Sequence, residues 1–342
     1  MCKNSGMRIG LIGYGAWGQH HAGAIGETPG LELAAICAES EASCRAAAAR
    51  FGVATTRDYR ELLALPGLEA VDIVLPTDLH HEVASAALRA GKHVLLEKPM
   101  ALTPEQCQDL VQLAGSRTLH VAHEFRLSTQ WGRMRRLIEE GAIGTPLAAA
   151  IDLWRRPYRI GANRWRYDAA RVGSWVLEEP IHFFDLACWW LRESGPPVSV
   201  YARASRRPAT PAGLWDNLHA VLGFAGGAHA TVTQSLAICE HHLAAKVIGD
   251  RGALLAFWDG ELDRTTHPRA SLQLYRQDGA LEDLPIAASG EFFELRAEMA
   301  HFLAVCQGRE PLVITAGEAA LAVAVCWAAE RSIQSGQAAA LQ

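Results

Sequence analysis

The amino-terminal part of the chain alternates short apolar runs with longer stretches whose apolar residues recur at helical spacing. The apolar runs, such as residues 8–12, include β-branched residues and have the length of strands buried on both faces of a parallel sheet. Glycines end several helical stretches, and Thr103-Pro104 begins another as N-cap and first helical residue. The predicted strands are 8–12, 31–37, 71–75, 92–96 and 119–122, and the predicted helices are 20–25, 41–51, 59–65 and 79–90.

The rest of the chain has a different pattern, in which many short strands follow one another and two apolar-rich helices come last. Gly226-Gly227 is typical of a hairpin turn. Short strands after a strand–helix half fit a second domain built on an open sheet. One face of such a sheet remains to be buried, which predicts oligomerisation. The predicted helices are 131–140, 181–191, 291–307 and 316–335, and the predicted strands are 147–154, 198–204, 217–224, 228–235, 244–248, 253–257 and 271–275.

The first predicted strand leads directly into residues 13–18, GYGAWG, a G-x-G-x-x-G sequence that opens a helix. Gly13 permits a tight turn, Gly15 lets the backbone approach a pyrophosphate, and Gly18 lets the helix pack closely on the strand. The helix N-terminus presents N–H groups to the anion. This order predicts a dinucleotide site whose turn includes Ala16 and Trp17, and a glycine-rich turn without a ligand is the alternative.

The second predicted strand ends about twenty residues after the glycine turn, where a dinucleotide fold often places an acid on the adenosine ribose. Glu39 stands at this tip. Its carboxylate would accept hydrogen bonds from the ribose hydroxyls and would repel a 2′-phosphate, which favours NAD. In the alternative alignment, the acid that contacts the ribose belongs at position 38, which is alanine in this chain, so NADP also stays open as the cofactor. Glu39 is a solvated loop residue in the alternative interpretation.

Two further strand ends face the expected cofactor crevice, because ligands bind at the carboxyl ends of strands in open α/β sheets. Proline after Lys98 rigidifies one of these turns and allows a cis peptide bond. A lysine amine fixed beside a nicotinamide would assist hydride transfer, and a surface ion pair with Glu97 is the alternative. The predicted cofactor residues at these ends are Pro76, Thr77, His80, Glu97 and Lys98.

The length of 342 residues predicts two domains. We place the dinucleotide-binding domain at 1–123 and a domain for substrate binding and oligomerisation at 124–342. In a variation of this plan, the carboxyl-terminal helices pack back on the first domain. The net charge of −5 argues against a nucleic-acid partner. The eight cysteines are scattered without a C-x-x-C pair, which is typical of buried thiols in a reducing compartment. No apolar run reaches the ~18 residues of a membrane span, and the start of the chain lacks the apolar core of a secretory signal. We therefore expect a cytoplasmic protein without a membrane partner.

Two stretches, GLIGYGAWGQHHAGAI and PTDLHHEVASAALRAGKHVLLEKPMALT, resemble the glucose–fructose oxidoreductase/inositol dehydrogenase (Gfo/Idh/MocA) family, and the resemblance extends over essentially the whole chain. It implies an α/β protein with an amino-terminal Rossmann domain and a carboxyl-terminal α/β domain on a large open, mostly antiparallel sheet. It also implies a bound NAD or NADP, with Lys98 in the catalytic site. Arg126 matches a basic position of the family that touches cofactor and substrate, whereas Glu124 departs from the usual amide.

Arginines and aromatic rings are interleaved between residues 154 and 175. This pattern also occurs in proteins that bind single-stranded nucleic acid, but the stretch is short and the chain is acidic. We expect the loop to line a polar pocket in which Tyr158 and Trp165 stack on a sugar-like ring and Arg166 donates to hydroxyls or a carboxylate. Packing at a subunit interface is the alternative for any single arginine.

Residues 178–185, EEPIHFFD, form the second candidate centre. On a helix, His182 and Asp185 share one face. A lone histidine before an apolar helix is usually a core residue, but the acidic neighbours favour a function. The family reads D-x-G-x-H-x-x-D here, which implies that His182 is the catalytic histidine and that Glu178 stands at the catalytic aspartate, with Pro180 replacing glycine. The predicted catalytic residues are Lys98, His182 and Glu178, and the predicted substrate residues are Arg126, Tyr158, Trp165, Arg166, Glu179 and Asp185.

These sites predict reversible hydride transfer between nicotinamide and a secondary alcohol of a sugar, cyclitol or amino-sugar, in a homodimer or homotetramer. His182 would accept the alcohol proton and Lys98 would stabilise the developing negative charge. The alternatives are a reductase of a related carbonyl, imine or dihydrodiol and a non-catalytic NAD(P)-dependent sensor. Whether the substrate carries an amine or an acid stays open, since both carboxylates and arginines surround the site. His241 and His242 have no partner at metal-ligand spacing, so we interpret them as structural or pocket-edge residues and expect no metal.

Overall fold

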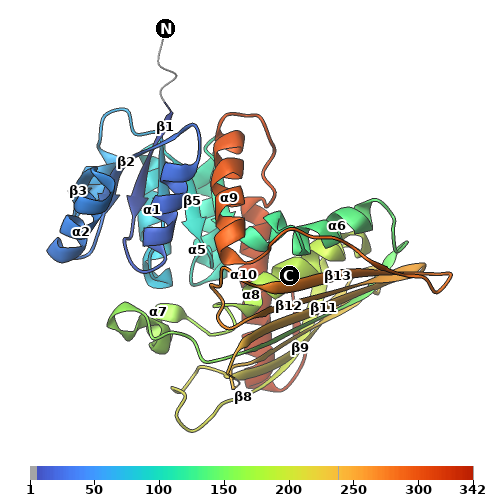
Figure 1. The fold of residues 1–342 in the computed structure, drawn as a ribbon. Helices are drawn as coiled ribbons and strands as arrows, with labels where there is room; N and C mark the ends of the chain where they lie inside the picture. The colour runs from blue at the N-terminus through green and yellow to red at the C-terminus, as the bar shows by residue number, and fades with distance from the viewer. Residues whose placement is uncertain (1–5, 238, 342) are drawn as a thin grey trace. The chain divides into compact units, whose positions relative to one another are not determined.

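The computed structural model describes residues 6–237 and 239–341, and the chain divides into two compact units (Figure 1). The first unit holds the chain up to His123 together with Leu295–Ala320, and the second holds Glu124–Glu294 and the segment from Leu321 onward. Residues 1–5, on which most of the expectation about a secretory signal rests, lie outside the described part. Among the described helices, none combines the length and the apolarity of a membrane span.

The first unit is built on a six-stranded parallel sheet. Its strands are β1 (Met7–Ile12), β2 (Leu31–Cys37), β3 (Ala54–Thr56), β4 (Ala70–Ile73), β5 (His93–Glu97) and β6 (Leu119–Ala122). They lie in the order β3-β2-β1-β4-β5-β6, so the direction of winding reverses between β1 and β4. This order confirms the predicted doubly wound sheet, and the reversal marks the edge at which such sheets bind ligands.

Helices cover this sheet and begin and end at the local signals that the sequence carries. Ser40 accepts from the backbone N–H of Ser43 at 3.1 Å at the start of α2, and Thr103 accepts from Gln106 at 3.3 Å at the start of α5. Gly52 ends α2 with a φ of +67°, a value that glycine adopts without strain. The helices are α1 (Gly18–Glu27), α2 (Glu41–Phe51), α3 (Tyr59–Leu63), α4 (His80–Arg89), α5 (Pro104–Ala114) and the part of α9 (Glu291–Cys306) from Leu295 onward.

The second unit is built on a nine-stranded sheet in the order β14-β13-β12-β11-β7-β10-β9-β8-β15. All neighbouring pairs are antiparallel except β7 and β10, which agrees with the predicted mostly antiparallel sheet. Helix α8 (Pro180–Trp190) packs on β7 and β10. The strands are β7 (Pro146–Arg155), β8 (Pro197–Ser205), β9 (Asn217–Phe224), β10 (His229–Ser235), β11 (His241–Gly249), β12 (Gly252–Gly260), β13 (Arg269–Arg276), β14 (Leu281–Asp283) and β15 (Ala339–Ala340). The other helices of the unit are α6 (Trp131–Glu139), α7 (Ala169–Val172) and the part of α10 (Ala316–Ser335) from Leu321 onward.

Burial alternates along the strands of the second sheet, so the sheet has an inner and an outer face. Leu243, Val247 and Leu254 on the inner face are buried. The outer face carries large apolar side chains that are 38–43% exposed, namely Tyr201, Val221, Ile248, Phe257 and Tyr275. The outer face is therefore more apolar than a solvated sheet surface requires.

Candidate functional site

The glycine-rich turn offers open space beside a helix N-terminus. A Cβ on Gly13, whose φ is +107°, would lie 2.1 Å from the carbonyl oxygen of Val74, and a Cβ on Gly18 would lie 2.0 Å from that of Gly13. These two glycines are therefore required by the fold. A Cβ on Gly15, in contrast, would meet no described atom within 4 Å, and Gly15 and Ala16 are exposed. This turn has the space and the N–H groups that a dinucleotide pyrophosphate needs.

A set of buried and half-buried side chains, which we call the turn network, connects this turn to the strand end that carries Lys98. It consists of Trp17, His21, Asp72 and Glu97. The indole N–H of Trp17 donates to Glu97 Oε1 at 2.6 Å, and the backbone N–H of Lys98 donates to Glu97 Oε2 at 3.2 Å. The ring of His21 lies between two carboxylates, with Nδ1 2.8 Å from Asp72 Oδ2 and Nε2 3.2 Å from Glu97 Oε1.

The charges in the turn network stabilise one another. Burial alone lowers the pKa of His21, but Asp72 and Glu97 outweigh it and raise that pKa to about 10. Burial raises the pKa of Glu97, but His21, Lys98 and Trp17 outweigh it and lower that pKa to about 2. Burial keeps the pKa of Asp72 above its usual range. At neutral pH His21 is therefore an imidazolium, which donates from Nδ1 to Asp72 and forms an ion pair with Glu97 on its Nε2 side.

The turn that carries Lys98 is also held by His80. The Lys98–Pro99 peptide bond is cis, as the sequence allows. The buried ring of His80 has Nδ1 2.7 Å from the carbonyl oxygen of Pro99 and Nε2 2.9 Å from that of Leu75, and burial lowers its pKa. His80, predicted to bind the cofactor, thus lies between the turn after β5 and the end of β4, where its one N–H as a neutral imidazole donates to one of the two carbonyl oxygens.

The remaining predicted cofactor residues also lie at strand ends of the first unit. Pro76 is half-buried and Thr77 is buried after β4, at the start of a short 3₁₀ turn that leads into α4. Glu39 is exposed after β2, where the Arg57 side chain donates to its carbonyl oxygen at 3.2 Å. A carboxylate and a guanidinium therefore both stand at the tip where the adenosine ribose is expected.

In the second unit, α8 holds His182 in a buried aromatic setting. The ring of Phe125 stacks on it with centroids 4.7 Å apart, and Glu124 Oε1 lies 3.8 Å from its Nε2. One turn further along α8, Asp185 forms a bidentate ion pair with Arg126, at 2.9 Å to Nε and 2.7 Å to Nη2. These two predicted substrate residues contact each other, and their ion pair fixes the helix that carries His182.

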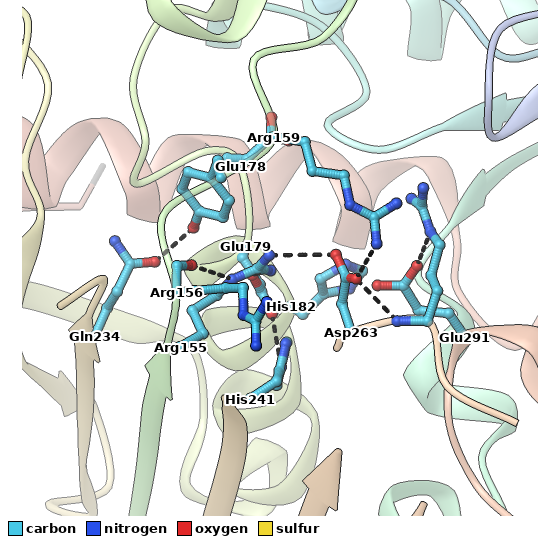
Figure 2. Close-up of polar contacts among 12 residues, drawn as sticks. Arg155, Arg156, Arg159, Glu178, Glu179, His182, Gln234, His241, Asp263 and Glu291 are labelled. Carbon is cyan, nitrogen blue, oxygen red and sulfur yellow. Dashed lines mark hydrogen bonds and ion pairs between the residues drawn. The ribbon is translucent and has the colours of Figure 1, made fainter. Parts of the chain in front are cut away.

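Glu178 and Glu179, just before α8, each contact an arginine. Glu178 pairs with Arg166, and Glu179 pairs with Arg155. Glu179 also lies 3.2 Å from His241 Nε2, so that it stands between a guanidinium and an imidazole (Figure 2). The predicted catalytic residue Glu178 is thus paired with a predicted substrate residue, Arg166.

The same cluster extends to residues that the sequence did not single out. Asp263 accepts from Arg155 at 3.2 Å and from Arg159 at 2.9 Å (Figure 2). Arg264 contacts Glu291 at 2.6 Å. Burial raises the pKa of Asp263, but the three arginines outweigh it and keep that pKa below its usual range. This second set of ion pairs adds to the two formed by Glu178 and Glu179.

The aromatic residues predicted to stack on a sugar pack on these arginines. The guanidinium of Arg155 lies 4.8 Å from the ring of Tyr158, whose hydroxyl donates to Gln234 at 2.6 Å. The guanidinium of Arg166 lies 4.5 Å from the half-buried ring of Trp165. Tyr158 and Trp165 therefore support the arginines that hold the carboxylates.

Several functional candidates escaped sequence reasoning because their partners are distant in sequence. His241, which the sequence indicates as a structural or pocket-edge residue, lines a small pocket, but its contact with Glu179 has no signal in the sequence. Asp72 did carry a signal, since an acid within the apolar run VDIVL needs a buried partner. Within residues 6–237 and 239–341, no group of three or more His, Cys, Asp or Glu side chains is arranged to hold a metal ion.

Comparisons with known proteins cover both units. A model of the Gfo/Idh/MocA oxidoreductase family with an NAD-binding Rossmann fold matches residues 7–125, and a model of the Gfo/Idh/MocA C-terminal domain matches residues 131–255. Inositol 2-dehydrogenase/D-chiro-inositol 3-dehydrogenase of Lactiplantibacillus plantarum is 26% identical over 72% of this chain and 70% of its own. Levoglucosan dehydrogenase of Pseudarthrobacter phenanthrenivorans is 27% identical over 73% of each chain. A structure of levoglucosan dehydrogenase with NADH and L-sorbose has the same fold, with a TM-score of 0.84, 22% identity and 99% of each chain covered.

Proposed function

Because the chain belongs to the Gfo/Idh/MocA family of oxidoreductases, we propose that it transfers a hydride between a nicotinamide cofactor and a secondary alcohol of a sugar, cyclitol or amino-sugar. Relatives named as inositol and levoglucosan dehydrogenases support this substrate class, because both names describe polyhydroxylated rings. The observation that carries the proposal is the turn network, which connects the glycine-rich turn to the backbone of Lys98. The glycine-rich turn proposed to bind the dinucleotide and the residue that carries the Lys98 amine are thus connected within the first unit.

In the proposed mechanism, Gly13, Gly15 and Gly18 give the backbone room for the pyrophosphate, and NAD or NADP supplies the hydride acceptor. Lys98 donates a hydrogen bond to the alcohol oxygen and stabilises its developing negative charge. His182 accepts the alcohol proton, a role that suits an imidazole near neutral pH. The Arg126–Asp185 ion pair holds the helix that positions His182.

Glu39 favours NAD over NADP in this proposal, because its carboxylate would repel a 2′-phosphate, while Arg57 beside it would attract one. The substitution Glu39→Ala is expected to lower the NAD-to-NADP ratio of kcat/KM at least about tenfold, which corresponds to about 1.4 kcal/mol. Arg57→Ala is the matched control and should raise the ratio. An unchanged ratio in Glu39→Ala assigns cofactor choice to other residues.

The test of the function itself is a panel of sugars, cyclitols and amino-sugars offered with NAD and with NADP, and of carbonyl, imine and dihydrodiol compounds offered with both forms of each cofactor. Turnover is followed by the absorbance of the reduced nicotinamide. Oxidation of at least one ring is expected. Turnover of only carbonyl, imine or dihydrodiol substrates would assign a reductase, and cofactor binding without any turnover would assign a sensor.

We also propose that copies of the chain associate through the outer face of the second sheet, as a homodimer or homotetramer in the cytoplasm. The partly exposed apolar side chains of Tyr201, Val221, Ile248, Phe257 and Tyr275 support this interface. No disulfide bond joins the cysteines that the structure describes, which supports a reducing compartment.

A further inference from the structure

A chain of hydroxyl groups ends on a buried carboxylate at the start of α9. The hydroxyl of Ser289 donates to Glu294 Oε1 at 2.8 Å, and the backbone N–H of Gly290 donates to Glu294 Oε2 at 2.7 Å. The hydroxyl oxygens of Ser128 and Ser289 lie 2.9 Å apart. Glu294, Ser289 and Ser128 are each at most 2% exposed, and all three belong to the second unit. These polar groups therefore satisfy one another in place of water.

The directions of these hydrogen bonds match an ionised Glu294. Because the Ser289 hydroxyl donates to the carboxylate, it accepts from Ser128, whose own oxygen accepts from the backbone N–H groups of residues 130 and 131 at 3.0 and 3.1 Å. A proton on Oε2 would face the N–H of Gly290. A proton on Oε1 would turn both serine hydroxyls around, toward an oxygen that already accepts two bonds. Protonation of Glu294 therefore removes one hydrogen bond from the set.

The carboxyl group of Glu294 titrates near neutral pH. Burial raises its pKa to about 7, although the two serine hydroxyls and the backbone N–H lower it, and the charge of Glu291 raises it further. Charged side chains of the surrounding elements have other partners, in the pairs Glu291–Arg264, Glu298–His120, Glu124–His182, Arg126–Asp185, Asp259–Arg269 and Asp263–Arg159 and in the contact of Arg133 with the carbonyl oxygen of Pro285.

The serine chain supports the segment that packs on His182. Ser128 directly follows the 3₁₀ turn of residues 124–127, and its backbone N–H donates to the carbonyl oxygen of Phe125 at 3.2 Å. The ring of Phe125 stacks on that of His182. A change at Glu294 therefore reaches the ring of His182 through one short stretch of backbone.

We infer that Glu294 is a positioning residue for the proposed reaction: its carboxylate, acting through the two serines, holds the segment that packs on His182, and protonation loosens that segment. The inference rests on the proposed function, in which His182 accepts the alcohol proton. It predicts two ionisations in the pH dependence of turnover, one of His182 and one of Glu294, because each group acts in its deprotonated form.

The substitution Glu294→Gln separates this role from that of a helix cap. Glutamine keeps an acceptor for the Gly290 N–H but does not ionise, so it retains the arrangement of the protonated acid. At a pH well above the pKa of Glu294, we expect kcat to fall about tenfold, the effect of one lost hydrogen bond, with KM nearly unchanged. The pH profile should have two steps in the wild type and one in the variant. The control Glu330→Gln changes another buried carboxylate that accepts from a serine, Ser174, and should keep both steps.

Thermal unfolding separates a loss of positioning from a loss of fold. The pKa of Glu294 is raised from 4.5 to about 7, so its ionisation lowers the stability as the pH rises through that range. The Glu294→Gln variant stays neutral and should therefore melt no lower than the wild type above this range. A lower melting temperature there would assign Glu294 a structural role and overturn the inference.

Nuclear magnetic resonance of the whole histidine-labelled enzyme follows the same coupling without a substrate. The His182 ring signal, assigned by its loss in His182→Asn, should shift with a second midpoint near 7, the pKa of Glu294. That midpoint should vanish in Glu294→Gln and in Ser289→Ala, which lacks the hydroxyl between the carboxylate and Ser128. It should persist in Glu330→Gln.

The inference is overturned if Glu294→Gln keeps both steps in either measurement, if Glu330→Gln loses one, or if Ser289→Ala leaves the second His182 midpoint unchanged. The proposed function fails separately, because the resonance measurement needs no turnover. A second His182 midpoint that depends on Glu294, in an enzyme that oxidises none of the rings offered, would support the coupling between the two residues and refute the reaction.

Discussion

The substitution His21→Asn tests whether the turn network is a buried ion cluster that stabilises the first unit. Asparagine keeps a polar group but removes the positive charge that Asp72 and Glu97 share. Removal of one partner from a buried ion pair costs about 3–5 kcal/mol. The rise in the pKa of His21 from 6.5 to about 10 is of the same order, at about 1.4 kcal/mol per unit. We therefore expect the free energy of unfolding to fall by about 3–5 kcal/mol.

The pH dependence of this loss follows from the direction of the two pKa shifts. The pKa of His21 is raised, so its contribution is complete below about 6.5 and disappears as the pH rises through about 10. The pKa of Glu97 is lowered, so its contribution is complete above 4.5 and disappears as the pH falls through about 2. The difference between wild type and variant should therefore be largest between pH 4.5 and 6.5 and shrink toward pH 10.

Urea denaturation followed by circular dichroism at a series of pH values measures this difference. The matched control is His81→Asn, because His81 forms a histidine–carboxylate pair with Asp109 at 2.7 Å that is partly exposed. An exposed pair contributes about 0–1 kcal/mol, so the control should change little. Equal losses in His21→Asn and His81→Asn, or a loss at His21 that does not vary with pH, would refute the reasoning.

Other expectations follow from the same structure. Lys98→Ala and His182→Ala should each reduce turnover by orders of magnitude while NADH still binds, as measured by fluorescence titration, and near-normal turnover in both would remove the catalytic assignment. Gly15→Val should keep the fold but weaken NADH binding at least about tenfold, because the valine side chain enters the open space that the cofactor needs. Gly13→Ala should instead lower the melting temperature, because the new Cβ meets a carbonyl oxygen 2.1 Å away. Phe257→Asp should reduce the mass measured by light scattering, and an unchanged mass would exclude the outer face as the interface.

Local sequence patterns predicted much of the fold because they act over neighbouring residues. Strands β2, β6 and β9 and helices α2 and α10 have the predicted ends, since a cap, a glycine or a change in apolar spacing marks each one. Strand β3 was missed because three residues are too short to display alternation. The four-residue helix α7 was missed for a similar reason, since it is little more than one turn after Asp168.

The candidate site was less predictable, because its contacts join residues that are far apart in the chain. The G-x-G-x-x-G sequence placed Gly13 and Gly15 correctly in a strand-to-helix turn. No spacing rule indicates that Trp17 and His21 contact Glu97, or that His241 contacts Glu179. The loop arginines were assigned to the substrate because their charges were visible in the sequence, while the carboxylates that pair with them were not visible as partners.

The support of the Lys98 turn from both sides has a consequence for the entropy of ligand binding. His80 holds the carbonyl oxygen of Pro99, and Glu97 holds the backbone N–H of Lys98, through bonds within the chain. The backbone of this turn is ordered before any ligand arrives, so little backbone entropy remains to be lost there on binding. Preorganisation of this kind lowers the entropy lost in forming a complex.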